Sequence, residues 1–382
     1  MYIIYDDFYL KHFTGPSHVE NAGRLAAIIA AIKKSSLFKD LDFFKPDKAD
    51  TNQVCLIHDP AYVKKIEALS EEAKESDYNM LFNIDMDTVV SKYTYESAML
   101  AAGAGVGGID MLFGEKKGDI FFALVRPPGH HAFKDNGSGF CIFNNIAIAA
   151  AYSIENHGLK KVAIIDFDVH HGNGTQDIFY EDDRVLYISL HQYPHYPGTG
   201  DWLENGRKKG EGFNLNIPLA ANSNENDYLY AVNKIILPVL ERFVPELLLF
   251  SAGYDAHKDD PLSLINLEDD SYRKIMELIL RRHRQLSVGK ISITGVAGNN
   301  SKSNPGGFKT GIILEGGYNY EATARSVLKT ISACLEMPKE ADFSCACPPE
   351  GSSGGKTAAA AEDGLNARNL KNFNSIKKLF AI

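Results

Sequence analysis

The stretch Val162 to Thr175, with the sequence VAIIDFDVHHGNGT, constrains the fold more than any other part of the chain. Four apolar residues lead into two aspartates and two histidines, and a Gly-Asn-Gly turn follows. A short apolar run bounded by turn residues is typical of a strand buried on both faces of a parallel sheet. Because ligands bind at the carboxyl ends of the strands in such sheets, we expect a functional site directly after this strand.

Asp168 and His170 stand two residues apart, so in an extended backbone their side chains point to the same side and can share one ion. Asp166 stands two residues before Asp168, so its side chain points to the same side of the strand. A carboxylate beside an imidazole suits a divalent metal such as zinc or ferrous iron. A single aspartate in this place would more often cap the next helix. Two aspartates and two histidines packed so densely need partners, which favours the metal site.

Composition limits the classes of protein to consider. The chain has 382 residues, of which 45% are hydrophobic and 23% charged, which is enough for a large core. The net charge of -9 argues against a general nucleic-acid binder and admits a cationic substrate. The start, MYIIYDD, lacks the basic region of a signal peptide, and no apolar run approaches the roughly 20 residues that span a bilayer. We therefore expect a cytoplasmic protein that does not enter a membrane.

Strands alternate with helices along the chain, which predicts an α/β protein with a parallel sheet covered by helices on both faces. Every polar cluster follows a strand, so all of them should meet at one edge of the sheet. The expected strands are Tyr2 to Tyr5, Val54 to His58, Asp119 to Val125, the strand at Val162, Val185 to Leu190, Phe213 to Ile217, Leu247 to Ser251 and Ile312 to Leu314. The expected helices are Asn21 to Lys34, Asp59 to Glu75, Ser91 to Phe113, Asn144 to Asn156, Glu225 to Phe243, Glu268 to Arg284 and Tyr320 to Leu335.

Three regions depart from this alternation. A Gly/Asn/Ser-rich insertion is expected at 291–310, before the last strand. Residues 338–366 are rich in Pro, Gly, Ser and Ala and predict a flexible linker after a main domain of residues 1–337. Residues 367–382 have apolar residues near helical spacing, which predicts a short amphipathic segment that docks on the main domain.

Six motifs carry most of the polar and glycine-rich clusters of the chain. They are RPPGHHA at Arg126 to Ala132, GFCIFNN at Gly139 to Asn145, DFDVHHGNGT at Asp166 to Thr175, ISLHQYPHYPGTGD at Ile188 to Asp201, GYDAHKDDPL at Gly253 to Leu262 and LEGGYN at Leu314 to Asn319. Together, in this order, they resemble the histone deacetylase superfamily, which includes the acetylpolyamine amidohydrolases. The resemblance covers roughly Met1 to Met337. It implies a single three-layer α/β/α domain with a central, mostly parallel sheet of the arginase and deacetylase type, and one catalytic metal that serves to hydrolyse an acetylated amine.

The resemblance implies the ligand set Asp168, His170 and Asp255. Three protein ligands leave the metal an open position for water and substrate, as a catalytic site requires. The ion is zinc or ferrous iron, and the family also binds potassium close by. By position, the potassium ligands would come from Asp166, Asp168, His170, Ser189 and Leu190.

Amide hydrolysis also needs a histidine that moves protons. By resemblance, Asp166 orients His130 and Asn173 orients His131. An aspartate raises the basicity of its neighbouring imidazole more than a neutral asparagine does. We therefore assign His131 as general base and then general acid, and His130 a mainly electrostatic role. Tyr318, after two glycines, fits the donor to the oxyanion.

The resemblance also implies a narrow tube for the alkyl chain of the substrate, with Phe140 and Tyr196 as aromatic walls. Gly139 would offer its carbonyl to the substrate amide, and Asp87, with Asp85 as rival, would hold the substrate at the rim. Arg24 matches an arginine that lines an internal channel for acetate. The segment GPSHVENAGRL around it departs from the HPE-x-PERL form of relatives.

Three alternative functions fit the sequence less well. A two-manganese ureohydrolase needs further bridging aspartates, which DVHHGN and DAH do not offer. Nucleophilic catalysis by Cys141 needs an exposed, activated thiol, but apolar residues flank this one. The five scattered cysteines do not predict a disulfide framework, and Cys345 and Cys347 are expected to be incidental thiols. A non-catalytic scaffold that binds acetyl-lysine requires that a catalytic group be missing, and none is missing from these motifs.

Acetyl-lysine in proteins or peptides is the expected substrate, and an acetylated polyamine or small metabolite is the alternative. The oligomeric state is open.

Overall fold

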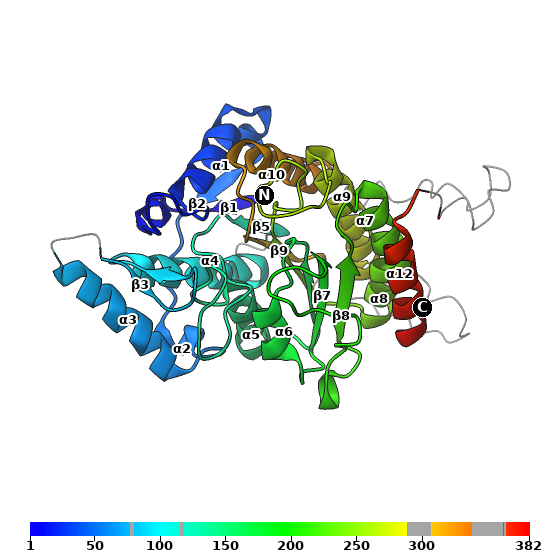
Figure 1. The fold of residues 1–382 in the computed structure, drawn as a ribbon, viewed down its shortest axis with the longest axis horizontal. Coiled ribbons are helices and arrows are strands. Elements are labelled where there is room, and N and C mark those ends of the chain that lie inside the picture. Colours follow the sequence, from blue (N-terminus) through cyan, green and yellow to red (C-terminus); the bar gives the residue numbers. More distant parts are fainter. Residues whose placement is uncertain (77–79, 115–117, 289–306, 338–361, 363) are drawn as a thin grey trace.

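The computed structural model describes residues 1–76, 80–114, 118–288, 307–337, 362 and 364–382. Its centre is an eight-stranded sheet in the order β2-β1-β5-β10-β9-β6-β7-β8, and every neighbouring pair is parallel (Figure 1). The strands are β1 (Tyr2–Ile4), β2 (Asp42–Phe44), β5 (Ile120–Ala123), β6 (Val162–Asp166), β7 (Val185–Gln192), β8 (Asn214–Leu219), β9 (Leu247–Ala252) and β10 (Thr310–Leu314). A separate hairpin pairs β3 (Phe82–Asn83) with β4 (Val89–Val90).

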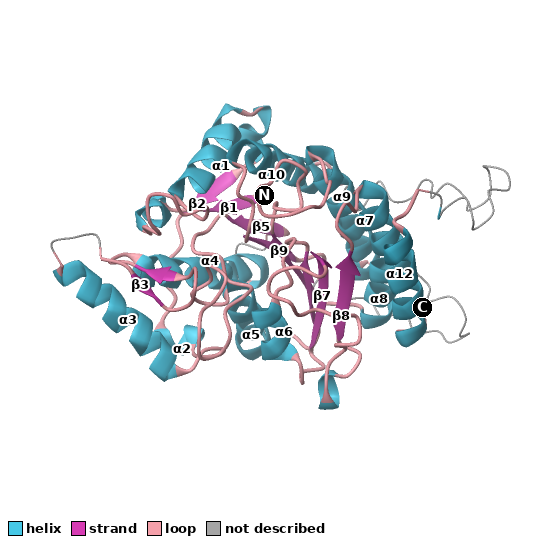
Figure 2. Ribbon diagram, in the orientation of Figure 1, coloured by secondary structure: helices cyan, strands magenta, loops and turns pink. Residues whose placement is uncertain are grey.

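Helices cover both faces of this sheet, which gives the three-layer α/β/α arrangement predicted from the sequence (Figure 2). The helix α4 packs on α5, β5 and β10 in one layer, and α1, α10 and α9 pack on one another in the other. The helices are α1 (Ala22–Lys34), α2 (Thr51–Val54), α3 (Pro60–Glu75), α4 (Thr94–Phe113), α5 (Asn145–His157), α6 (Asn173–Phe179), α7 (Glu225–Ala231), the π-helical turn η4 (Val232–Ile236), α8 (Leu237–Phe243), α9 (Asp269–Ser287), α10 (Tyr320–Leu335) and α12 (Ala367–Leu379). Short 3₁₀ helices lie at η1 (Asp7–Lys11), η2 (Ser36–Asp40) and η3 (Lys208–Gly210).

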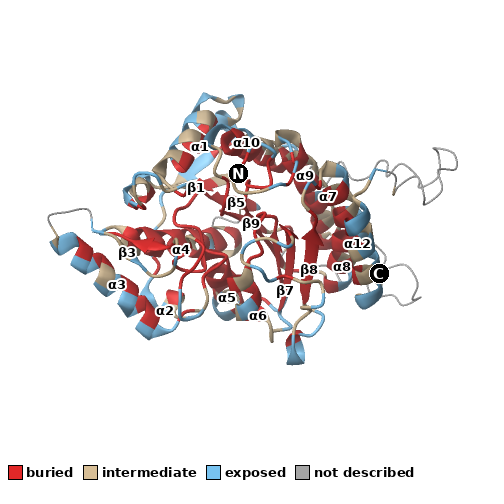
Figure 3. Ribbon diagram, viewed as in Figure 1, coloured by how far each residue is buried: buried red, intermediate tan, exposed pale blue. Residues whose placement is uncertain are grey.

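The central strands are buried along their whole length, as a sheet covered on two faces requires (Figure 3). The strands β5, β10, β9 and β6 are consecutive neighbours in the sheet. The loops that follow these four strands carry the motifs RPPGHHA, EGGY, GYDAH and DFDVHH. The residues of these four motifs therefore lie at one edge of the sheet, although they come from four distant parts of the chain.

Two differences from the expected elements lie near the N-terminus: one expected strand is absent and one observed strand was missed. Val54 to His58 is not a strand: α2 ends at Val54 and a turn follows. The reason is a capping box, in which the side chain of Asp50 accepts from the N–H of Gln53 and the side chain of Gln53 accepts from that of Asp50. The edge strand β2 was missed because it has three residues, is partly exposed and carries no alternating pattern.

The last helix, α12, packs against β8 at the far edge of the sheet from β2. Its buried Asn369 accepts from the N–H of Ala220 at 2.7 Å and donates to Ser223 and Asp227. The ring of Phe373 stacks on Tyr230, with their centroids 5.4 Å apart. The helix therefore covers the edge strand that would otherwise be open.

Most of the predicted insertion at 291–310 and of the predicted linker at 338–366 lies outside the described residues. Among the described helices, all are too short or too polar to cross a membrane.

Candidate active site

Three side chains from two neighbouring strands converge at the edge of the sheet. Asp168 and His170 follow β6, and Asp255 follows β9. Nδ1 of His170 lies 3.1 Å from Oδ1 of Asp168 and 3.1 Å from Oδ2 of Asp255. One ligand atom from each of the three lies within 4.8 Å of the others, and all three residues are buried. This is the set that the sequence resemblance implied as metal ligands.

The donor set and its surroundings fit a divalent cation. Two buried carboxylates face one another, and burial together with the charge of Asp168 raises the pKa of Asp255 to about 7. A cation at this point would offset that repulsion. The backbone leaves room for the carboxylates only because Gly253 and Gly316 lack a side chain, since a Cβ at either would collide with Asp168. Two carboxylate oxygens and one imidazole nitrogen are ligands suited to zinc or ferrous iron.

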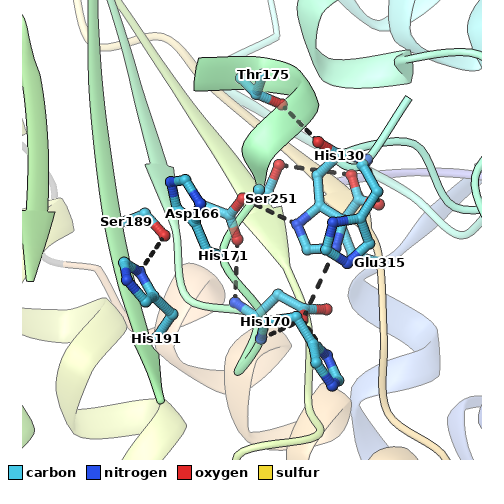
Figure 4. Close-up of polar contacts among 12 residues, drawn as sticks. His130, Asp166, His170, His171, Thr175, Ser189, His191, Ser251 and Glu315 are labelled. Atoms are coloured by element: carbon cyan, nitrogen blue, oxygen red, sulfur yellow. Dashed lines mark hydrogen bonds and ion pairs between the residues drawn. The ribbon is translucent and has the colours of Figure 1, made fainter. Parts of the chain in front are cut away.

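The tandem histidines His130 and His131 lie next to this cluster in different electrostatic settings. Figure 4 shows the first of them, His130, beside Asp166. Nδ1 of His130 lies 3.0 Å from Oδ2 of Asp166, and Nδ1 of His131 lies 2.7 Å from Oδ1 of Asn173. Burial alone would lower the pKa of His130, but the charges of Asp168 and Asp166 outweigh it and raise this pKa to about 10. Burial and the neighbouring His130 hold the pKa of His131 well below its usual value. His131 is therefore the neutral ring of the pair, with Nε2 free to accept a proton.

Tyr318 lies between two side chains that fix its ring. The guanidinium carbon of Arg24 lies 4.8 Å from the ring centre, and the ring of Phe140 meets it edge to face at 5.7 Å. Its backbone N–H donates to Oδ2 of Asp260 at 2.6 Å. Burial raises the pKa of Tyr318 well above its usual value, which the charge of Arg24 offsets only in part. The hydroxyl therefore keeps its proton and can donate a hydrogen bond.

Gly139 and Phe140 adopt left-handed backbone angles, with φ of +52° and +70°. Glycine is required at 139, because a Cβ there would collide with the ring of His131. A left-handed phenylalanine is strained, and its N–H is held by Thr88 at 3.0 Å. The ring of Tyr196 meets that of His131 edge to face at 5.2 Å and is 42% exposed. The two predicted wall residues thus contact different site residues, Tyr318 for Phe140 and His131 for Tyr196.

The two rim carboxylates differ in what they already bind. Asp85 accepts from the N–H of Met86 within its own turn. Oδ1 of Asp87 is buried and has no hydrogen-bond partner among the described residues, while its backbone carbonyl lies 3.0 Å from Nε2 of His18. His18 in turn meets the ring of Phe140 edge to face at 4.8 Å. Asp87 therefore has a buried carboxylate oxygen without a partner among the described residues.

The residues predicted to hold potassium surround the buried end of β6. Asp166 is the register partner of Ser189 in β7, and Leu190 follows it, wholly buried. The hydroxyl of Ser189 is engaged with Nδ1 of His191 at 2.9 Å. Asp166, Asp168 and Ser189 carry side-chain oxygens, which is the ligand type that a hard monovalent cation prefers.

Sequence reasoning missed a buried ionic cluster behind Tyr318. The carboxylate of Glu20 accepts from Arg24 at 3.0 Å and from two nitrogens of Arg126 at 2.5 and 2.7 Å. Burial would raise the pKa of Glu20, but Arg126 outweighs it and lowers this pKa. Arg24 also donates to the carbonyls of Gly317 and Glu315. The sequence offered one signal for this cluster: Arg126, and Glu315 whose carbonyl binds Arg24, each stand shortly after a strand.

Another missed residue is His195, whose ring stacks on that of His170 at 5.1 Å. Its Nε2 lies 2.9 Å from the carbonyl of Leu262. This histidine stands directly before Tyr196 within the YPHYPGTGD segment, and no ligand spacing marked it in the sequence.

Cys141 does not have the surroundings of a nucleophile. It is wholly buried, and burial raises the pKa of its thiol well above the usual value. It forms a second cluster with His130 and Glu315. The donors of this cluster are already used, since His130 binds Asp166 and Glu315 binds two backbone amides.

Comparison with known proteins agrees with this geometry. The family model described as the histone deacetylase domain matches residues 18–334. Histone deacetylase 14, chloroplastic, of Arabidopsis thaliana is 36% identical over 84% of this chain and 73% of its own length. The histone deacetylase-like amidohydrolase of Pseudomonas aeruginosa is 35% identical over 74% and 72%.

The solved structure titled as the crystal structure of the HDA15 HD domain superposes with a TM-score of 0.81 at 28% identity, covering 99% of this chain and 93% of the other. The match extends to the fold as a whole, including the parallel sheet that presents the site. The chain thus belongs to the histone deacetylase family, a family of metal-dependent hydrolases that act on acetylated amines.

Proposed function

We propose that this protein is a zinc-dependent deacetylase that removes the acetyl group from acetyl-lysine in proteins or peptides. The single observation that carries the proposal is the convergence of Asp168, His170 and Asp255 beside a histidine whose pKa is lowered. Asp168, His170 and Asp255 would hold a divalent ion, zinc or alternatively ferrous iron, which would supply a Lewis acid for the acetyl carbonyl and for water.

The side chains of the chain supply the rest of the reaction. His131, neutral at rest, takes a proton from the attacking water and later gives it to the leaving amine. His130, kept cationic by the charges of Asp168 and Asp166, stabilises negative charge near the carbonyl. The hydroxyl of Tyr318 donates to the oxyanion of the tetrahedral intermediate.

Binding of the substrate is assigned to the residues around the histidine pair. Phe140 and Tyr196 grip the methylenes of the alkyl chain, and the carbonyl of Gly139 accepts from the amide nitrogen that is to be released. Asp87 holds a donor of the substrate at the rim, because its Oδ1 lacks a partner among the described residues. Potassium beside Asp166, Asp168, His170, Ser189 and Leu190 completes the site. We assign these functions to residues 1–337 and keep the cytoplasm as the expected location.

The substrate is tested by an activity screen of zinc-loaded protein. Acetyl-lysine peptides and acetylated polyamines are offered side by side, with a ferrous preparation run in parallel. The proposal expects release of acetate from the peptides with the higher kcat/KM. Higher kcat/KM for the polyamines would establish the alternative substrate. No release of acetate from either class would overturn the deacetylase assignment and favour a binding scaffold.

A further inference from the structure

Glu315, at the end of β10, reaches across to the turn that carries the tandem histidines. Its Oε2 accepts from the backbone N–H of Gly129 at 2.7 Å and from that of His130 at 3.2 Å. Its other oxygen lies 3.4 Å from the hydroxyl of Ser251. The residue is wholly buried, and Figure 4 shows its side chain beside His130. One carboxylate oxygen thus binds two successive amides of the turn.

These two amides stand directly before the reacting side chains. The turn follows β5, which is the sheet neighbour of β10, so the carboxylate has to span only the gap between adjacent strand ends. The turn is also packed closely from the other side, because a Cβ at Gly129 would collide with the backbone of Asn145. A backbone held on both sides leaves the rings of His130 and His131 little freedom to shift.

The three residues that follow Glu315 each touch another part of the site. The N–H of Gly316 donates to Oδ2 of Asp168 at 2.8 Å, and the carbonyl of Gly317 accepts from Nε of Arg24 at 2.6 Å. Tyr318 then faces Phe140. Displacement of the turn relative to Glu315 would therefore change the position of the histidine pair relative to both the ligand Asp168 and Tyr318.

We propose that Glu315 is a positioning residue, whose side chain fixes His130 and His131 against the metal ligands and Tyr318 by accepting from the two turn amides. The proposal deepens the proposed deacetylase function and rests on it. The reach of the side chain matters here more than its charge, because an amide oxygen at the same place would accept the same two N–H groups.

Two variants separate reach from charge. Glu315→Gln keeps the length of the side chain and removes its charge, whereas Glu315→Asp keeps the charge and withdraws the oxygen by one methylene. We expect kcat of the Gln variant within about threefold of the parent. We expect the Asp variant to lose about 100-fold in kcat, with KM and metal content unchanged, since misplaced catalytic groups cost about this much. The opposite ranking of the two variants would overturn the proposal.

Amide hydrogen exchange at Gly129 and His130 gives a readout that does not need activity. Exchange should be faster in the Asp variant and parental in the Gln variant. If the parent releases no acetate from any substrate, the proposed function fails, and the ranking of exchange rates still decides the role of Glu315. If the Asp variant does not fold, the Gln variant decides alone: parental exchange and kcat support the proposal, and loss of both overturns it.

Glu204 provides a matched control. Its carboxylate also accepts from two successive backbone amides, those of Gly200 and Asp201, each at 3.1 Å. Glu204→Asp should speed exchange at those two amides while kcat stays within about threefold of the parent. A 100-fold loss of kcat in this control as well would mean that any loosened loop slows the reaction, and the specific role of Glu315 would be wrong.

Discussion

The guanidinium of Arg24 lies against the ring of Tyr318, 4.8 Å from its centre, and donates at the same time to the carbonyls of Gly317 and Glu315. One wholly buried side chain from α1 therefore fixes both the ring and the backbone of the residue assigned to the oxyanion. The planar, five-donor guanidinium suits this combination of stacking and forked donation, which a lysine cannot reproduce.

Replacement of Arg24 by Lys should therefore slow the reaction although the charge is kept. We expect kcat to fall by about tenfold or more, because the donors to Gly317 and Glu315 are lost and Tyr318 is less well placed. Steady-state kinetics with an acetyl-lysine peptide measure the effect. Arg325→Lys is the control, since Arg325 is exposed and pairs with Asp269 on the surface. A kcat of R24K equal to that of the parent would show that Arg24 is not needed to position Tyr318.

Tyr318→Phe removes one hydroxyl and leaves the ring contacts with Phe140 and Arg24 in place. The loss of an oxyanion donor costs about 100- to 1,000-fold in kcat. Metal content should stay parental, because Tyr318 is not among the three ligands. Tyr320→Phe, two residues away and 39% exposed, is the control. A variant as fast as the parent would show that the oxyanion is stabilised elsewhere.

Asn173→Asp tests which histidine is the base. The pKa of His131 is low because of burial and the positive His130 beside it, and Asn173 is a neutral partner. A carboxylate at 173 would raise this pKa. The base works only when neutral, so the fall in kcat/KM on the acid side should move to higher pH in the variant. A pH-rate profile measures this shift. If the acid side of the profile does not move, the general base is a group other than His131.

The sheet and its helices were predictable because each central strand is a continuous apolar run bounded by turn residues, as in Val162 to Ile165. The closeness of Asp168 and His170 was predictable because the two residues share parity at a strand end. Asp50 and Gln53 overrode the strand expected at Val54 by a local capping box. The role of Glu20 was not predictable for a different reason: its partner Arg126 lies 106 positions away in the sequence.

The role of α12 in stability can be tested at Asn369. This buried side chain accepts from Ala220 and donates to Ser223 and Asp227, so Asn369→Ala leaves several buried polar groups unpaired. We expect a loss of about 2 to 3 kcal/mol in the free energy of unfolding, measured by urea denaturation. Asn374→Ala, at an exposed position of the same helix, should change little. Equal stability of the two variants would mean that α12 contributes nothing to the fold.

The most direct test of the account is a crystal structure of the active protein with anomalous data collected at the absorption edge of its metal. The account predicts one anomalous peak per chain, bound by Asp168, Nδ1 of His170 and Asp255, and predicts that chelation abolishes activity and that zinc or ferrous ion restores it. Fully active protein with no metal at these three residues, or with two metals bridged between them, would contradict it.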